Sequence, residues 1–209
     1  MLDQFFSHIS FVDIFNFCVF LAFTICYTYQ LYYVFVVLTR KPKKLVAKKN
    51  HRFAAVISAR NESAVIAQLL ESIRQQDYPQ DLLDIYVVAD NCTDGTASIA
   101  REHGARQNKM QVGKGYALAF LLEHIREEYP QERYDGYFVF DADNLLDPHY
   151  VTEMNKVFSN GNRAVTGYRN TKNFGDNWIT AGYGIWFLRE SEYLNRPRDY
   201  LGTSCAVSG

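Results

Sequence analysis

The stretch that decides the fold is Tyr137-Phe138-Val139-Phe140-Asp141-Ala142-Asp143-Asn144, an apolar run that ends in two carboxylates. Aromatic and β-branched residues in such a run predict a buried β-strand. If the backbone stays extended through Asp143, Asp141 and Asp143 share one face at the carboxyl end of the strand. Two close carboxylates repel each other unless a cation lies between them, and a hard divalent ion suits oxygen ligands. The alternative is an acidic loop or helix cap after a core strand.

Strand and helix patterns alternate along the chain from this stretch in both directions. Apolar runs predict strands at 53–58, 83–89, 137–140 and 164–168. Helical patterns follow at 66–73, 96–103, 111–125 and 148–159. The first helix has its apolar residues at Ile66, Leu69, Leu70 and Ile73, and the third at Leu118, Leu121, Leu122 and Ile125. This alternation predicts an α/β fold with a mostly parallel sheet flanked by helices.

The N-terminal segment has the composition of a membrane helix. No Asp, Glu, Lys, Arg or His occurs from Ile14 to Thr39, and this exceeds the ~20 apolar residues that cross a bilayer core. A signal peptide would carry its basic residues before the apolar core, whereas here they come afterwards. We therefore predict a retained transmembrane anchor over 1–39, with a tightly membrane-associated or partner-packed helix as the alternative.

The charge distribution indicates on which side of the membrane the rest of the chain lies. The net charge is −1, but basic residues are concentrated at 40–52, directly after the apolar segment. This pattern indicates membrane lipid as a partner and excludes nucleic acid. It places the basic linker 40–52 and the domain of 53–209 on the cytoplasmic side of the cell membrane. The four cysteines form no CxxC pair, so we expect no disulfides and a reducing compartment.

Three of the predicted strands end in polar turns, which the parallel order would bring to one edge of the sheet. These turns are Arg60-Asn61-Glu62, the stretch from Asp90 to Asp94, and the stretch from Asp141 to Asn144. A nucleotide diphosphate fits such an edge, because the base needs hydrogen-bond partners and the phosphates need cations. Lys114 at a glycine-flanked helix start is a candidate phosphate ligand, or else an ordinary exposed lysine. Asp94 is either a substrate contact or a cap of the next helix, and we favour the cap.

Four motifs in order carry a resemblance to a known family. They are Ser58-Ala59-Arg60-Asn61-Glu62, the run from Val87 to Thr96, the run from Gly113 to Leu118, and Asp141-Ala142-Asp143. Together they resemble family 2 glycosyltransferases, in the membrane-anchored branch with cellulose, hyaluronan, chitin and poly-N-acetylglucosamine synthases. The match runs from about Phe53 to the end of the chain.

The resemblance implies a GT-A fold and inverting transfer from a nucleotide-sugar donor, usually a UDP-sugar, with Mg²⁺ or Mn²⁺. The acceptor would be a glycan or a lipid-linked molecule, as in polysaccharide biosynthesis. Asp90 would contact the uracil or ribose, and Asp143 with Asp141 would hold the metal against the diphosphate. The remaining expected substrate contacts are Arg60, Asn61, Glu62 and Lys114.

Two departures from the family pattern set further expectations. The stretch 104–111 is short and polar, so we expect that edge of the sheet to be reduced. The 202–209 segment resembles the start of the acceptor-side region, so we expect the domain to be incomplete and the general base to lie beyond Gly209. No catalytic residue is assigned, since Glu190, Glu192 and Asp199 match no motif.

Other functions remain as alternatives. A sugar-phosphate nucleotidyltransferase or a dinucleotide-dependent oxidoreductase would need a glycine-rich loop after the first strand, and Ala59-Arg60-Asn61-Glu62 has no glycine. A non-catalytic, membrane-tethered binding module is the alternative from another class. The aromatic residues Trp178, Tyr183, Trp186 and Phe187 are either a sugar-stacking surface or part of an apolar helix buried against sheet or membrane.

Overall fold

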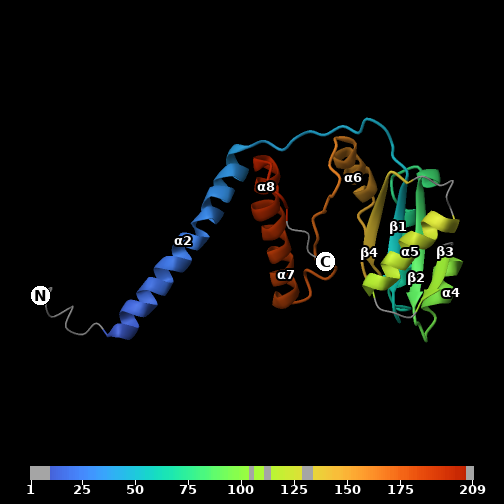
Figure 1. The fold of residues 1–209 in the computed structure, drawn as a ribbon, viewed down its shortest axis with the longest axis horizontal. Coiled ribbons are helices and arrows are strands. Elements are labelled where there is room, and N and C mark those ends of the chain that lie inside the picture. Colours follow the sequence, from blue (N-terminus) through green and yellow to red (C-terminus); the bar gives the residue numbers. More distant parts are fainter. Residues whose placement is uncertain (1–9, 104–105, 111–113, 129–133, 206–209) are drawn as a thin grey trace, which may run out of the picture. The chain divides into compact units, whose positions relative to one another are not determined.

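The chain forms two compact units, which are described separately. The computed structural model describes residues 10–103, 106–110, 114–128 and 134–205. One unit comprises Lys44–Val165, and the other combines the described parts of Met1–Lys43 and Thr166–Gly209. In Figure 1 the first unit contains all the strands and the second contains the long N-terminal helix.

The Lys44–Val165 unit is built on one sheet of four parallel strands in the order β3-β2-β1-β4. Their bounds are β1 Phe53–Ala59, β2 Leu83–Asp90, β3 Arg106–Met110 and β4 Gly136–Asp141. The predicted parallel sheet is therefore confirmed. At the carboxyl edge, Ala59 of β1 lies opposite Ala89 of β2, and Ser58 lies opposite Asp141 of β4.

Helices cover both faces of this sheet, as Figure 1 shows for α5. The connecting helices are α3 Ile66–Arg74, α4 Thr96–Glu102, α5 Lys114–Glu128 and α6 Tyr150–Ser159, with a short 3-10 turn, η1, at Gln80–Leu82. Alternate residues of β1 face opposite ways. Ala55 and Ile57 pack with residues of α3, α4 and α6, whereas Ala54 and Val56 pack with residues of α5. Burial of both faces of the sheet is expected when strands alternate with helices in the sequence.

The predicted apolar faces of the helices are largely confirmed. Ile66, Leu69, Leu70 and Ile73 of α3 are all fully buried or nearly so. In α5, Leu121 and Ile125 are buried, but Leu122 is 38% exposed. Helix α6 begins at Tyr150, two residues after the expected start at Pro148.

Two strand predictions were wrong, in opposite directions. The 106–110 segment forms β3 and pairs with β2, so this edge of the sheet is not reduced as expected. Strand pairing uses backbone groups, and an edge strand needs no apolar run. The 164–168 segment forms no strand, because high strand propensity yields a strand only where a partner pairs with it.

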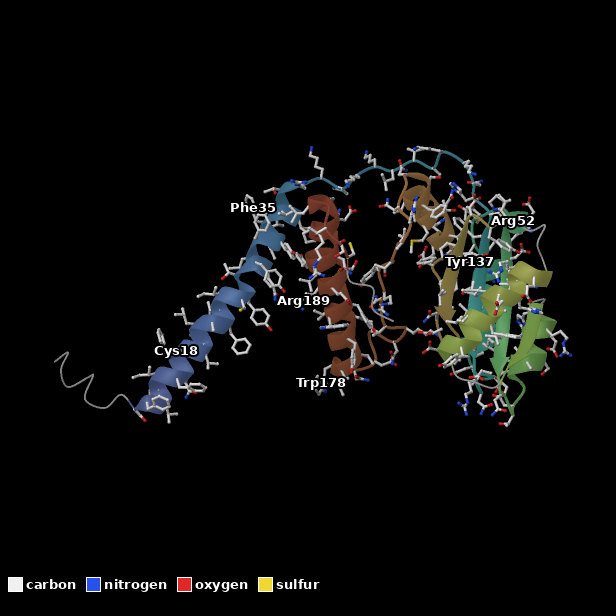
Figure 2. All side chains as sticks on the ribbon, in the orientation of Figure 1. Cys18, Phe35, Arg52, Tyr137, Trp178 and Arg189 are labelled. Carbon is white, nitrogen blue, oxygen red and sulfur yellow. The ribbon has the colours of Figure 1, made fainter. Side chains whose placement is uncertain are left out.

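The amino-terminal edge of the sheet is closed by polar contacts. Arg52 Nη2 and the Tyr134 hydroxyl both donate to Asp84 Oδ2, each at 2.8 Å. The Arg52 guanidinium also lies over the Tyr134 ring, 5.5 Å from its centre, and Figure 2 labels Arg52 at this end of the unit. These contacts fix the start of β1.

The second unit consists of helices. They are α2 Phe11–Thr39, α7 Trp178–Leu188, the π-helical segment η2 Arg189–Asn195, and α8 Arg196–Leu201. Helix α2 has 29 residues, a length of about 43 Å at 1.5 Å per residue. Among the described residues, α2 is long and apolar enough to cross a bilayer, with a mean hydropathy of 1.8 in its most apolar window. Its side chains project outward on all sides, as at Cys18 and Phe35 in Figure 2.

Polar contacts join α2 to η2 and α8. Arg189 Nη2 donates to Gln30 Oε1 at 2.7 Å, and Arg40 Nη1 donates to the Tyr200 carbonyl at 2.8 Å. Gln30, one of several polar residues in the apolar segment, thus has a specific partner. All four cysteines of the chain are described and free.

Two glycines of α7 give a matched test of its packing. A Cβ at Gly184 would lie 2.4 Å from Phe174 Cδ2 and 2.9 Å from Asn170 Oδ1, whereas a Cβ at Gly182 would meet nothing within 4 Å. We expect Gly182→Ala to stabilise by up to about 1 kcal/mol through helix propensity. Gly184→Ala should destabilise by about 1–3 kcal/mol through overpacking. Thermal unfolding by circular dichroism measures both, and equal shifts would contradict this packing.

Candidate active site at the carboxyl edge of the sheet

The direction of the strand order changes between β1 and β4. From β1 the chain proceeds through α3 to β2 and then to β3 on one side, whereas β4 lies on the other side of β1. Neighbouring strands whose connections run in opposite directions leave an opening outside their carboxyl ends, where open α/β sheets bind ligands. The residues that follow β1 and β4 therefore form the candidate site.

The end of β4 is shaped by Asn144. The strand stops at Asp141, and a turn follows in which the Asn144 N–H donates to the Asp141 carbonyl at 3.0 Å. The Asp141 N–H in return donates to Asn144 Oδ1 at 3.1 Å. The expectation that the backbone stays extended through Asp143 was therefore wrong. Ala142 turns into the core, 4% exposed, and Asp143 turns outward.

The turn leaves two carboxylates at the end of β4 as candidate cation ligands. Asp143 is exposed, and Asp141 is half-buried. One oxygen of Asp143 accepts a 3.4 Å hydrogen bond from the Asn144 amide. Within the described part of the chain, no group of three or more His, Cys, Asp or Glu side chains gathers as a metal site. Two carboxylates suit Mg²⁺ or Mn²⁺, which complete their coordination with water and substrate phosphate.

Asp90 ends β2 at the same edge. It is 3% exposed and lies in register with Met110 of β3. The next residue, Asn91, adopts a left-handed conformation with φ of 52°, which turns the chain sharply away from the sheet. The structure thus places Asp90 at the predicted edge, as a buried carboxylate at the base of the β2–α4 loop.

The Arg60-Asn61-Glu62 turn follows β1 at this edge and lies against the β2–α4 loop. Asn61 also has a left-handed backbone, with φ of 55°. Its Oδ1 accepts from the Thr93 N–H at 2.9 Å. The Glu62 N–H donates to the Thr96 hydroxyl at 2.8 Å. Arg60 is exposed.

Asp94 is held by backbone and hydroxyl donors from both loops. Its Oδ1 accepts from the Thr96 N–H at 3.0 Å and from the Thr96 hydroxyl at 2.5 Å, and its Oδ2 accepts from the Ser63 N–H at 3.1 Å. Asp94 thus bonds to the first N–H of α4 from the position before the N-cap, which is Gly95 and has no side-chain cap. These hydrogen bonds, above all that of the Thr96 hydroxyl, hold the pKa of Asp94 well below its usual range.

Because the pKa of Asp94 is lowered in the folded state, the free energy of unfolding depends on pH. The carboxylate of Asp94 is stabilised in the folded state, so its contribution is fully present above the unfolded pKa of about 3.9 and is lost as the pH falls below that value. We expect the unfolding midpoint to drop between pH 5 and pH 3, and to drop less in Asp94→Asn. Thermal melts across this range measure the slope, and identical slopes in both proteins would contradict the assignment.

The remaining predicted ligand is only partly placed. Lys114 is the first residue of α5, which agrees with the predicted helix start. Its side chain, and the glycine at 113, lie outside the described residues. A phosphate-binding role for Lys114 stays a prediction.

The site also contains residues that the sequence prediction overlooked. Asn144 closes the turn after β4, and Thr93 and Thr96 contact the loop after β1. A hydroxyl residue two positions after Asp94 is a recognisable turn signal. Its bond to a loop more than thirty residues earlier depends on the strand order, which local sequence does not reveal.

Known proteins share this fold. The mannosyltransferase PcManGT from Pyrobaculum calidifontis, solved with GDP-Man and Mn²⁺, is 24% identical and superposes with a TM-score of 0.54, covering 88% of this chain and 57% of that one. The four-stranded parallel sheet with its flanking helices is thus the GT-A glycosyltransferase fold.

The sequence places the chain more narrowly. The model of the family described as "Glycosyltransferase like family 2" matches residues 51–200, and the chain belongs to this family. The probable glycosyltransferase YdaM of Bacillus subtilis is 32% identical over 46% of this chain and 24% of its own length. The β-monoglucosyldiacylglycerol synthase of Nostoc is 26% identical over 66% of this chain and 32% of its own length. The chain therefore spans about a quarter to a third of these relatives.

Proposed function

We propose that the protein transfers a sugar from a nucleotide-sugar donor, with inversion, to a glycan or lipid-linked acceptor at a membrane surface. One observation carries the proposal: Asp141 and Asp143 follow β4 at the carboxyl edge of the sheet beside β1, where sheets of this topology bind ligands. Membership of the glycosyltransferase family supports the reaction class.

Each acidic residue of the edge has a proposed part. Asp90, buried at the end of β2, would orient the base or ribose through its carboxylate. Asp143 and Asp141 would hold Mg²⁺ or Mn²⁺ between them. The bound ion would stabilise the charge that develops on the departing diphosphate. Arg60, exposed directly after β1, would attract the negatively charged donor.

The nucleobase of the sugar donor can be tested directly. The mannosyltransferase with the same fold was solved with GDP-Man, whereas the family resemblance favours a UDP-sugar. We expect UDP to bind the full chain in Mn²⁺ more tightly than GDP or ADP, as measured by calorimetry. Tighter binding of GDP would transfer the proposal to a GDP-sugar, and failure of all three nucleotides would refute it.

We propose that α2 anchors the protein in the membrane, with the basic linker on the cytoplasmic side. The apolar length of α2 supports the anchor. Lys41, Lys44 and Lys48 are exposed and form no ion pair with any described residue, which leaves them available to anionic lipid headgroups. The linker backbone is held in place, because Asn155 Nδ2 donates to the Lys49 carbonyl at 2.9 Å.

The anchor and its orientation have separate tests. Carbonate extraction should leave the protein in the membrane pellet, since a spanning helix is not removed by high pH. Trypsin should cleave the 40–52 linker in inside-out vesicles and leave it intact in right-side-out vesicles. Release by carbonate would refute the anchor, and the reverse protease pattern would refute the orientation.

The acceptor is proposed only by class. Trp178, Tyr183 and Trp186 of α7 are 83%, 59% and 49% exposed, and Figure 2 shows Trp178 at the free end of its helix. Exposed aromatic rings of this kind suit either sugar stacking or a membrane interface. The non-catalytic binding module remains the second candidate, and it predicts nucleotide binding without release of UDP from any UDP-sugar.

A further inference from the structure

Four residues between Cys92 and Thr96 contact the end of β1 or the loop that follows it. The Cys92 thiol lies 3.4 Å from the Ala59 carbonyl, and the Thr93 N–H donates to Asn61 Oδ1 at 2.9 Å. Further along, Asp94 Oδ2 accepts from the Ser63 N–H at 3.1 Å. In the fourth contact, the Thr96 hydroxyl accepts from the Glu62 N–H at 2.8 Å. Apart from Gly95, every residue from Cys92 to Thr96 thus contacts the end of β1 or the loop after it.

The centre of this arrangement is a closed set of hydrogen bonds. The Thr96 hydroxyl accepts from Glu62 and donates to Asp94, so both of its roles are used. Thr96 is fully buried. Asp94 accepts from both loops through different oxygens, so its carboxylate ties together two segments that are about thirty residues apart in the chain.

The contact between the two loops also occupies the side-chain oxygen of Asn61. Its Oδ1 accepts from the Thr93 backbone N–H at 2.9 Å, with the Thr93 hydroxyl 3.4 Å away. Asn61 adopts a left-handed backbone, which Asn tolerates better than most residues. Conformation and side-chain bonding therefore both favour Asn61 as a residue that shapes the loop.

We propose that Asn61, Asp94 and Thr96 form a clasp that holds the two loops as one preformed nucleotide-binding surface. Within it they act as positioning residues and do not contact the donor. Asn61, which the sequence indicated as a substrate contact, is reassigned by this proposal. It rests on the proposed function for its effect on the nucleotide, whereas its effect on the loops is independent of any ligand. A surface that is already ordered binds its ligand without the entropy cost of ordering it.

Threonine 96 offers the most specific test. Thr96→Val removes the hydroxyl and keeps the shape, whereas Thr96→Ser keeps the hydroxyl. We expect the Glu62 amide to exchange with solvent deuterium about fivefold faster in the valine variant, since a hydrogen bond contributes about 1 kcal/mol. UDP affinity in Mn²⁺ should fall about five- to tenfold in the same variant, and the serine variant should restore both.

The two left-handed asparagines supply a matched control. Asn61→Gly and Asn91→Gly make the same change at backbones of nearly equal φ, 55° and 52°, but only Asn61 accepts from the Thr93 N–H. We expect faster exchange at Thr93 in Asn61→Gly alone, and weaker UDP binding in Asn61→Gly than in the wild type. Equal acceleration of exchange at Thr93 in the two glycine variants would overturn the contact between Asn61 and this loop.

Different results would refute the proposed nucleotide binding and the proposed clasp. If wild-type chain binds no UDP with Mn²⁺, the proposed function fails, and amide exchange still tests the clasp. If UDP binds but Thr96→Val leaves the Glu62 amide as slow as in wild type, the clasp is overturned. If exchange accelerates while UDP affinity stays at the wild-type value, the clasp exists but does not position the nucleotide, and the proposal fails.

Discussion

Asp143→Asn is expected to abolish the metal dependence of nucleotide binding. The carboxylate is exposed at the turn after β4, and an amide in its place supplies no negative charge to a cation. Because altering even an outer partner of a metal ligand costs about 10–100-fold in metal affinity, we expect loss of the ligand itself to remove the gain in UDP affinity that Mn²⁺ provides, about tenfold or more. Calorimetric titration of UDP into the variant, with and without Mn²⁺, measures both values.

A control variant separates this effect from loss of charge. Asp81→Asn removes the same charge from an exposed residue of η1, which precedes β2 at the opposite edge of the sheet. It should bind UDP and Mn²⁺ as the wild type does. If Asp143→Asn retains the wild-type response to Mn²⁺, the metal does not bind at this turn.

Leu70→Ala is expected to have the largest effect on stability. Leu70 lies in α3, is fully buried, and belongs to the core between the sheet and α3. Truncation of such a leucine removes buried apolar surface and leaves a cavity, at a cost of about 2–5 kcal/mol. Denaturant unfolding monitored by circular dichroism measures the loss as a lower midpoint at unchanged slope.

The matched control lies on the same helix. Gln68 is exposed, so Gln68→Ala should change stability by no more than about 0.5 kcal/mol. A loss in Leu70→Ala no larger than in Gln68→Ala would show that α3 does not pack on the sheet as described.

The elements that the sequence predicted well are those that one local pattern determines. Apolar runs located β1, β2 and β4, and the spacing of Ile66, Leu69, Leu70 and Ile73 located the buried face of α3. Burial is the physical cause of both patterns. The parallel order followed from the alternation of strands with helices, because a helix returns the chain to the start of the next strand.

The prediction errors arose where the structure of a segment depends on the residues that pair with it. The polar segment 106–110 forms β3 because β2 offers it a backbone edge, and 164–168 forms no strand. The turn after Asp141 depends on a bond from Asn144, which local propensity does not specify.

The same reason limits prediction of the site. The acidic residues at 90, 141 and 143 could be assigned to one edge from their positions after strands. The contacts of Asn61 with Thr93 and of Asp94 with Ser63 required the folded arrangement of both loops. A polar loop residue looks the same in the sequence whether it binds a ligand or another loop. The sequence therefore indicated Asn61 as a ligand contact, whereas in the structure its side chain bonds to Thr93.

The central claim is that a nucleotide diphosphate and a divalent cation bind together at the edge between β1 and β4. Calorimetric titration of UDP into the wild-type chain, in Mn²⁺ and again in excess chelator, tests it most directly. We predict that Mn²⁺ tightens UDP binding by at least about tenfold, which corresponds to about 1.4 kcal/mol. Equal affinity under the two conditions would contradict the account.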